Sequence, residues 1–301
     1  MTSPGPDTQT PTFPALNRRF SREREFWRRF RRRYIGLVSL LFLLFVLFAA
    51  IFQDFTARGI DPIAIDPTAP LAGFTWDHWM GTDTLGRDTW ARLVVGARTA
   101  MLVGLISVFI GAGLGLPIGL LAGWWGGRRD ELLMRLMDAI FAFPALLLAL
   151  IIIAGLGVGL TNVMIAIGVG FIPSFARLVR GSTLSVKEQD YVTAAQSIGG
   201  GDVRIASRHI LPNTLAPVIV QGSLLFGVAI IIEAALSFLG LGTQPPDPSW
   251  GIMLAAAQRL IRTEPMLALV PGVTISLTVL AFNLVGDVLR DLLDPRLRGA
   301  D

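Results

Sequence analysis

The chain has 301 residues, of which 52% are apolar and only 16% are charged, and its mean hydropathy is +0.61. These values exclude an ordinary soluble protein and predict one that is embedded in a membrane. The formal net charge is +4, and the absence of cysteine excludes disulfides and thiolate metal sites.

Residues 1–33 are predicted to form a cytoplasmic tail. Residues 1–17 are polar and rich in proline and threonine, which is typical of a disordered segment and not of a cleavable signal. The arginine-rich stretch that follows carries interleaved aromatic residues at Phe20, Phe26, Trp27 and Phe30. Such a stretch suits either nucleic acid or a lipid surface. The apolar run that begins directly after it favours an amphipathic helix on an anionic cytoplasmic leaflet.

Six apolar stretches are long enough to cross a bilayer, which takes roughly 20 helical residues. They are residues 34–52, 97–123, 132–156, 160–179, 214–239 and 266–289. With the N-terminus in the cytoplasm, twenty of the 26 basic residues fall inside, as the positive-inside rule requires. We therefore expect an all-α integral membrane protein with six transmembrane helices and both termini cytoplasmic.

These spans divide the chain into four parts. The predicted parts are a tail (1–33), a first helix with an outer loop (34–96), a core of five helices (97–290) that includes a cytoplasmic loop (181–213), and a C-terminal cytoplasmic tail (291–301). In the outer loop, Asp83, Arg87 and Asp88 can pair at a turn fixed by Gly81 and Gly86. This group either contacts a substrate or forms a structural clasp that packs the loop on the membrane domain, and we favour the clasp. Three outer tryptophans suit the aromatic belt of a membrane interface: Trp76, Trp79 and Trp90.

The connection between the second and third spans is short and basic. A tight cytoplasmic turn is expected at Gly126, Gly127 and Arg128. Asp138 opens the following apolar run, where it either caps the helix or pairs with Arg135, or else lines a path through the membrane. Pro144 is expected to kink the third span.

The cytoplasmic loop carries the most informative pattern in the chain. Its first half has the apolar spacing of an amphipathic helix, with Tyr191, Val192, Ala194, Ala195 and Ile198 on one face. The glycines at 199–201 break this helix, Asp202 is placed to cap a second one, and Pro212 is expected to end it. An apolar ridge that faces the cytosol requires a partner.

The fifth span contains Glu233 within an apolar run. An ionisable group at such a position is costly and is by default a functional hypothesis. Glu233 therefore lines a path, bonds a neighbouring helix or sits near the outer mouth. After the span, the prolines at 245, 246 and 248 predict a rigid outer hairpin that Trp250 seats at the membrane interface. In the last span, Arg290 can neutralise Asp287 or Asp291 near the inner face.

The cytoplasmic loop resembles the "EAA loop" of ABC importer permeases. The matching positions are Ala194, Ala195, Gly199, Leu211 and Pro212, while Thr193 stands where the family has glutamate. The outer turn is similar to the GTD-x-x-GRD signature of the peptide/nickel branch. Residues 236–251 and the ending at Asn283, Gly286 and Asp287 are similar to that branch too.

The resemblance implies the type I permease fold and the second, C-type permease of a pair, in the cytoplasmic (inner) membrane. The implied partners are a second permease subunit, two ATPase subunits that bind ATP and magnesium, an extracytoplasmic binding protein and membrane lipids, with no nucleic acid and no cofactor in this chain. The ATPase-coupling residues implied are Tyr191, Ala194, Ala195, Ile198, Gly199, Leu211 and Pro212. Gly126, Gly127 and Arg128 would form a secondary contact.

The implied cargo is a dipeptide, oligopeptide or glutathione, and the alternative is nickel or another small solute. An ion-coupled carrier or channel using Glu233 and Asp138 would be expected to show inverted repeats and paired charges, which are not evident. A membrane enzyme lacks a nucleophile–base constellation in this sequence. Lys187 is the only lysine and follows no glycine-rich loop, so the chain has no phosphate cradle for ATP hydrolysis.

Overall fold

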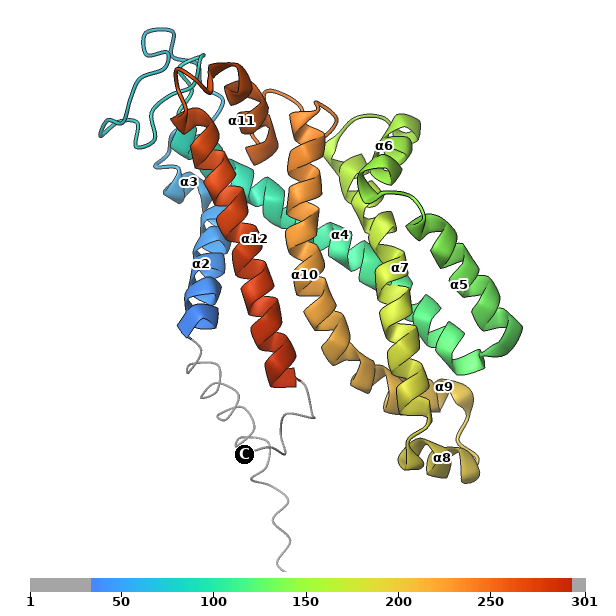
Figure 1. Cartoon of the computed structure of the whole chain (residues 1–301). Helices are drawn as coiled ribbons and strands as arrows, with labels where there is room; N and C mark the ends of the chain where they lie inside the picture. Colours follow the sequence, from blue (N-terminus) through green and yellow to red (C-terminus); the bar gives the residue numbers. More distant parts are fainter. Residues whose placement is uncertain (1–33, 294–301) are drawn as a thin grey trace, which may run out of the picture.

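A computed structural model of the chain describes residues 34–293, and each regular element in that range is a helix (Figure 1). The helices are α2 (Tyr34–Ile51), α3 (Gln53–Thr56), α4 (Thr89–Trp125), α5 (Gly127–Phe141), α6 (Ala145–Leu156), α7 (Leu160–Lys187), α8 (Asp190–Ser197), α9 (Asp202–Ile205), α10 (Leu211–Phe238), α11 (Trp250–Ala257) and α12 (Met266–Leu293). A π-helical turn (Ala206–Ile210) joins α9 to α10, and a 3₁₀ turn (Gln258–Leu260) follows α11. The surface helix predicted within residues 1–33, and the tail after residue 293, lie outside the described residues.

Five helical stretches between residues 34 and 293 are long and apolar enough to cross a membrane. They are α2, α4, α7, the run from α9 through α10, and α12. The third predicted span is not one straight helix, because α5 and α6 meet at an angle of 89°. Pro144, the residue before α6, lacks the N–H that would continue the α5 hydrogen-bond ladder. The expected kink is therefore a complete break, and α5 with α6 can form a sixth span only as a broken pair.

Helix α4 connects the two ends of the molecule. It begins at Thr89 rather than at residue 97, and its 37 residues extend about 55 Å. Since the hydrocarbon core of a bilayer is only about 30 Å thick, a helix of this length fits the membrane only if it is strongly tilted or projects beyond it. Figure 1 shows α4 running obliquely behind the other helices, from the loop of residues 57–88 (the loop end) to the side on which α8 and α9 lie (the elbow end).

Among the described helices, α4 packs most extensively on α7. Glycines spaced four residues apart on α4 face α7, and a methyl group added to Gly115 would lie 2.7 Å from the carbonyl oxygen of Ile172. Added to Gly119, it would collide with the carbonyl oxygen of Ala176. Small residues thus bring the two backbones into contact, the usual mode of helix association in membranes.

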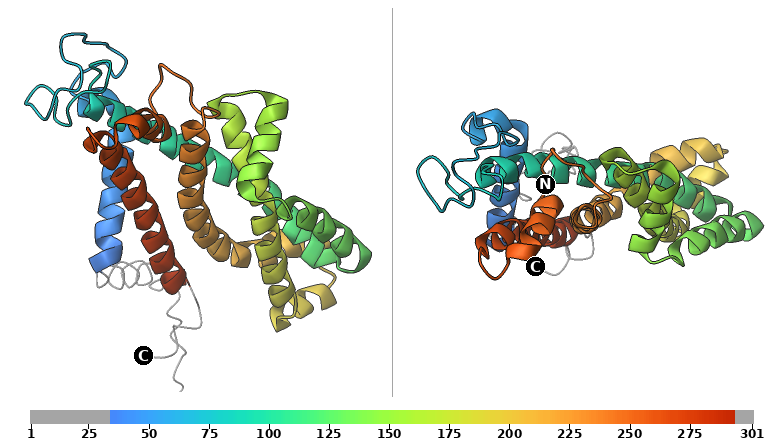
Figure 2. Two further views of the ribbon diagram at one scale, coloured as in Figure 1. Left: turned by 45° about the horizontal axis from the view of Figure 1, so that its top comes forward. Right: turned by 90° about the horizontal axis from the view of Figure 1, so that it is seen from above.

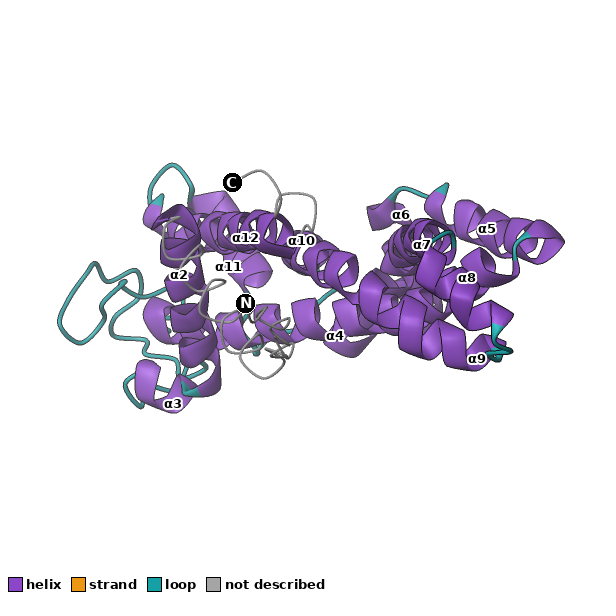
Figure 3. Cartoon of the chain, turned by 90° about the horizontal axis from the view of Figure 1, so that it is seen from below, coloured by secondary structure: helices purple, strands orange, loops and turns teal. Residues whose placement is uncertain are grey.

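The remaining helices gather around α4 in two groups, which Figures 2 and 3 show at opposite ends of an elongated molecule. At one end, α2, α11 and α12 pack with α4 and α10 around an apolar cluster that includes Val46, Ala97 and Ile230. At the other end, α6 and α7 pack on α4 and α10 around Val163, Phe171 and Phe175.

Trp250 is buried inside the protein, so it does not seat the hairpin in lipid as the sequence predicted. It begins α11, with Ser249 as the N-cap residue, and only 1% of its surface is exposed. Its indole N–H donates a 2.9 Å hydrogen bond to the carbonyl oxygen of Leu93 on α4. The indole N–H therefore has its hydrogen-bond partner within the protein and needs none at the lipid surface. The bond fixes the start of α11 to α4.

Candidate functional site

The predicted cytoplasmic loop forms two short helices, α8 and α9, which we call the elbow (residues 190–205). It projects from the end of α7 at one extremity of the molecule (Figure 1). Helix α8 ends at Ser197, and Gly199 has a φ of +83°, a value that side chains other than glycine rarely tolerate. The glycine break expected from the sequence is confirmed.

One face of the elbow packs on the end of α4. Val192 of α8, Ile205 of α9 and Ile210 of the π turn are buried against Trp124. Lys187, the last residue of α7, donates a 2.6 Å hydrogen bond from Nζ to the carbonyl oxygen of Trp124. These contacts hold the elbow on the ends of α4 and α7.

The opposite face of the elbow is apolar and exposed. Ile198 is 88% exposed and Val203 is 82% exposed, and Tyr191 and Ala194 are exposed beside them on α8. The predicted ridge is thus divided, because Val192 points into the protein and Ala195 is half-buried. Exposed apolar residues grouped on a short projecting element are typical of a protein-binding surface.

Two details of the second elbow helix differ from prediction. The N-cap residue of α9 is Gly201, not Asp202, so Asp202 lies in the first turn without a capping bond. Pro212 does not end the helical run but stands in the first turn of α10, directly after the π turn. The elbow consequently continues through the π turn into α10 without a stop. Pro212 is exposed and Leu211 is half-buried.

The turn between α4 and α5 lies at Gly126 and Gly127, both with positive φ, and Arg128 is exposed beside it. The sequence suggested that Asp138 pairs with Arg135, but the structure does not show this pair. The Asp138 carboxylate lies 3.9 Å from Arg177 of α7.

The pair that ties α5 to α7 is Asp130 with Arg180. The guanidinium of Arg180 donates two hydrogen bonds, of 2.6 and 2.7 Å, to the two carboxylate oxygens of Asp130. Arg135 bonds Glu131 within α5 instead. A polar cleft of about 340 Å³ lies between α5 and α7, lined by Asp130, Asp138, Arg177 and Arg180 among others.

Glu233 is only 1% exposed near the end of α10. Its carboxylate accepts a 2.7 Å hydrogen bond from the hydroxyl of Ser237 and a 3.4 Å bond from that of Thr243. In this conformation the group braces the connection between α10 and α11. A role of Glu233 or Asp138 in a path through the membrane stays a prediction.

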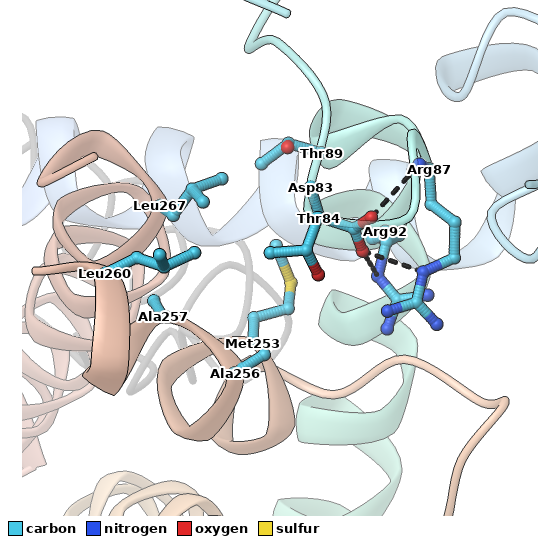
Figure 4. A pocket seen from close by; sticks show the side chains of 10 residues that line it. All are labelled: Asp83, Thr84, Arg87, Thr89, Arg92, Met253, Ala256, Ala257, Leu260 and Leu267. Atoms are coloured by element: carbon cyan, nitrogen blue, oxygen red, sulfur yellow. Dashed lines mark hydrogen bonds and ion pairs between the residues drawn. The ribbon is translucent and has the colours of Figure 1, made fainter. Parts of the chain in front are cut away.

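At the loop end, Asp83 and Arg87 are paired, with 2.7 Å between carboxylate Oδ2 and Nε. Asp88 takes different partners: it caps α4 by accepting from the N–H of Ala91, and it pairs with His78 at 2.9 Å. The Nε atom of Arg92 lies 3.8 Å from the Asp83 carboxylate. Arg92 follows Asp88 by one helical turn, and this spacing is the sequence signal that could have added it to the group. A pocket beside this group is shown in Figure 4.

An all-helical, membrane-spanning chain with an apolar elbow at one end and a folded loop at the other has the architecture of a transport permease. The comparisons with known proteins agree. Residues 115–299 match the family described as the binding-protein-dependent transport system inner membrane component. Residues 21–72 match the N-terminal TM domain of oligopeptide transport permease C. The chain therefore belongs to this family of inner-membrane permeases.

Named relatives are similar along most of their length. The glutathione transport system permease protein GsiD of Escherichia coli O6:K15:H31 (strain 536 / UPEC) is 46% identical over 275 residues, which cover 91% of each chain. The protein of the same name from Shigella boydii serotype 4 (strain Sb227) has the same identity and coverage.

Two solved transporters share the fold. An inward-facing form of the MetNI methionine ABC transporter has a TM-score of 0.55 at 18% identity, covering 66% of this chain and 95% of that one. An amino acid ABC transporter with histidines has a TM-score of 0.51 at 17% identity, covering 66% and 92%. These structures support the fold, and the family match with the 46% identical relatives shows that the chain is a multi-pass permease subunit of an ABC importer in the inner membrane.

Proposed function

We propose that this chain is the second, C-type permease of a heterodimeric ABC importer that takes up glutathione or other short peptides. The other permease completes the pathway, two ATPase subunits bind ATP and magnesium, and an extracytoplasmic binding protein delivers the substrate. The 46% identity to permeases named for glutathione transport supports this substrate class. Nickel or another small solute is the alternative cargo.

The observation that carries the coupling part of the proposal is the two-sided elbow. Its inner face is fixed on Trp124, while Ile198 and Val203 on its outer face are almost fully exposed. An ATPase subunit docks on the exposed face, and Gly126 to Arg128 form a secondary contact. Because the elbow packs on the ends of both α4 and α7, a displacement of the elbow moves these helices as a unit.

A substitution on the exposed face tests the coupling. Ile198→Asp places a charge where an apolar contact is proposed, yet it disturbs no packing within this chain because Ile198 is 88% exposed. In the reconstituted importer, we expect uptake per ATP hydrolysed to fall at least tenfold. The matched control is Gln196→Asp, an exposed polar position two residues earlier in α8, which should keep uptake near the wild-type value. Normal uptake by Ile198→Asp would remove the elbow from the coupling mechanism.

The substrate is tested separately. Proteoliposomes containing both permeases and both ATPases, supplied with the cognate binding protein, are compared for uptake of glutathione, a dipeptide and Ni²⁺. Uptake of glutathione or the dipeptide, but not of Ni²⁺, is the expected result. Uptake of Ni²⁺ alone would establish the alternative cargo.

A further inference from the structure

Asp138 on α5 and Arg177 on α7 mark one border of the membrane-spanning region. Between them, residues 139–176 contain no aspartate, glutamate, lysine, arginine or histidine. The two ends of this uncharged stretch meet in the fold, where Nη2 of Arg177 lies 3.9 Å from an oxygen of the Asp138 carboxylate. Because charged side chains are costly inside the hydrocarbon, the pair lies where the hydrocarbon ends and the lipid headgroups begin.

The polar cleft between α5 and α7 lies at this border, on the elbow side of the molecule, and we call it the border cleft. Figure 1 shows the two helices side by side in the half of the fold that carries α8. The cleft volume of about 340 Å³ is in the range of small-ligand sites. Its lining residues are Gly127, Asp130, Glu131, Met134, Asp138, Arg177 and Arg180.

Arg177 faces the border cleft with unused hydrogen-bond donors. Its guanidinium lies over the ring of Phe141, 3.8 Å from the ring centre, and its side chain is 40% exposed. The 3.9 Å contact with Asp138 is too long for a hydrogen bond, and the structure shows no other acceptor for this guanidinium among the described residues. A planar set of N–H donors held on an aromatic face is suited to bind a phosphate group.

The charges of the cleft cancel in pairs. Asp130 is bonded by Arg180 through two hydrogen bonds, and Glu131 is bonded by Arg135 at 2.5 Å. Asp138 balances Arg177 but keeps its carboxylate oxygens free to accept a further donor, since its side chain is 65% exposed. A cleft without net charge, in which one cation and one anion lie side by side with spare bonding capacity, suits a ligand that carries both charges.

Apolar side chains continue from the charged pair toward the hydrocarbon. Phe141, the last residue of α5, and Phe143, just after it, are both exposed. Leu136 is exposed on the same helix. A polar cleft that borders an exposed apolar surface is suited to an amphiphile whose charged end lies in the cleft.

From these observations, we propose that the border cleft binds the headgroup of a zwitterionic phospholipid with a primary ammonium group. The phosphate accepts hydrogen bonds from Arg177, the ammonium donates to Asp138, and the acyl chains lie along Phe141 and Phe143. The two-carbon link between phosphate and ammonium suits two side chains that are direct neighbours. An anionic lipid lacks a partner for Asp138. This binding does not rest on the proposed cargo or on ATPase docking.

The test measures lipid binding to the assembled importer in detergent by native mass spectrometry. The probe is dihexanoyl phosphatidylethanolamine, which is compared with the phosphatidylcholine and phosphatidylglycerol of the same chain length. The wild type should bind the ethanolamine lipid at least fivefold more tightly than the other two. The choline lipid has no ammonium N–H for Asp138, and the glycerol lipid has no cation.

Two variants locate the site. Asp138→Asn breaks no hydrogen bond of its side chain within the described residues, so it should fold normally. It should bind the ethanolamine lipid roughly tenfold more weakly, as expected for one lost charge-assisted hydrogen bond, and lose the preference over choline. Arg177→Gln removes the phosphate partner and should weaken binding of all three lipids. Asp287→Asn, an exposed carboxylate on α12 outside the cleft, should bind as the wild type does.

Equal wild-type affinity for the three lipids, or an unchanged ethanolamine preference in Asp138→Asn, overturns the proposal. Competition distinguishes the lipid from other zwitterions. Soluble phosphoethanolamine and glutathione, at the lipid concentration, should leave the bound lipid in place because neither has acyl chains. Displacement by phosphoethanolamine would make the free headgroup compound the ligand, and displacement by glutathione would make the cleft a peptide site. Either result would reject the phospholipid.

Discussion

Lys187 and Trp124 join the ends of α7 and α4 immediately before the elbow begins. The Lys187 ammonium donates a 2.6 Å hydrogen bond to the Trp124 carbonyl oxygen and lies 5.2 Å from the centre of its indole ring. A cation at the carboxyl end of a helix bonds a carbonyl that has no partner within the helix and interacts favourably with the helix dipole. The contact therefore fixes the elbow end of α4 to the helix that leads into the elbow.

Replacing Lys187 with methionine keeps the length of the side chain and removes its donor. We expect the loss of this charged hydrogen bond to cost on the order of 1–2 kcal/mol locally and to loosen the elbow. Hydrogen–deuterium exchange should accelerate in residues 188–200, and uptake per ATP should fall severalfold. Lys187→Arg retains a cationic donor and should behave nearly as the wild type. Unchanged exchange in Lys187→Met would show that the bond does not hold the elbow.

Gly119→Ala should destabilise the contact between α4 and α7. The added methyl group would collide with the Ala176 carbonyl oxygen and lie 2.8 Å from Cβ of Val179. Backbone atoms cannot move aside, so we expect a cost of about 1–3 kcal/mol and a lower thermal midpoint. Gly113→Ala, on the same helix with no atom within 4 Å, should be neutral or stabilising by up to about 1 kcal/mol. Equal midpoints for the two variants would contradict the close packing.

Arg180→Gln removes both hydrogen bonds to Asp130 and leaves that carboxylate largely buried. Because Arg180 is itself about one-third exposed, we expect a moderate loss, roughly 1–2 kcal/mol, with faster exchange of α5 amides. The double variant Asp130→Arg with Arg180→Asp restores an ion pair and should recover part of the loss. If the double variant recovers neither the stability nor the slow amide exchange of the wild type, the pair does not hold α5.

Gly86→Ala should disrupt the turn that carries Arg87 and Asp88. The φ of Gly86 is +74°, and a methyl group there would collide with the carbonyl oxygen of Asp66. Strain of about 1–2 kcal/mol from the backbone alone, together with the collision, should make residues 66–88 sensitive to protease. Gly73→Ala, in the same loop with open space around it, should leave protease resistance unchanged.

The sequence predicts the apolar helices well, because long hydrophobic runs follow directly from the thickness of the bilayer. Five of the six predicted spans are continuous helices. The break at Pro144 was predicted only as a kink, since hydropathy does not distinguish a bent helix from a straight one. The position of Pro212 could have been read correctly, because proline is common in the first turn of a helix.

Contacts between distant parts of the chain could not be predicted in the same way. Nothing in the local sequence indicates that Trp250 bonds the carbonyl of Leu93, or that Glu233 receives the hydroxyl of Thr243. These pairs depend on how helices cross. Lys187 offered a weaker signal, since the single lysine of the chain stands directly before the elbow.

We propose that the elbow faces the cytosol and is covered there by an ATPase subunit. Because the chain contains no cysteine, Ile198→Cys introduces a unique thiol in this subunit at an exposed position. The measurement is its reaction with a membrane-impermeant maleimide in vesicles of both orientations, with and without the ATPase subunits. We predict labelling only from the cytosolic side, and protection when the ATPases are bound. Labelling from the extracytoplasmic side, or equal labelling with and without the ATPases, would contradict the account.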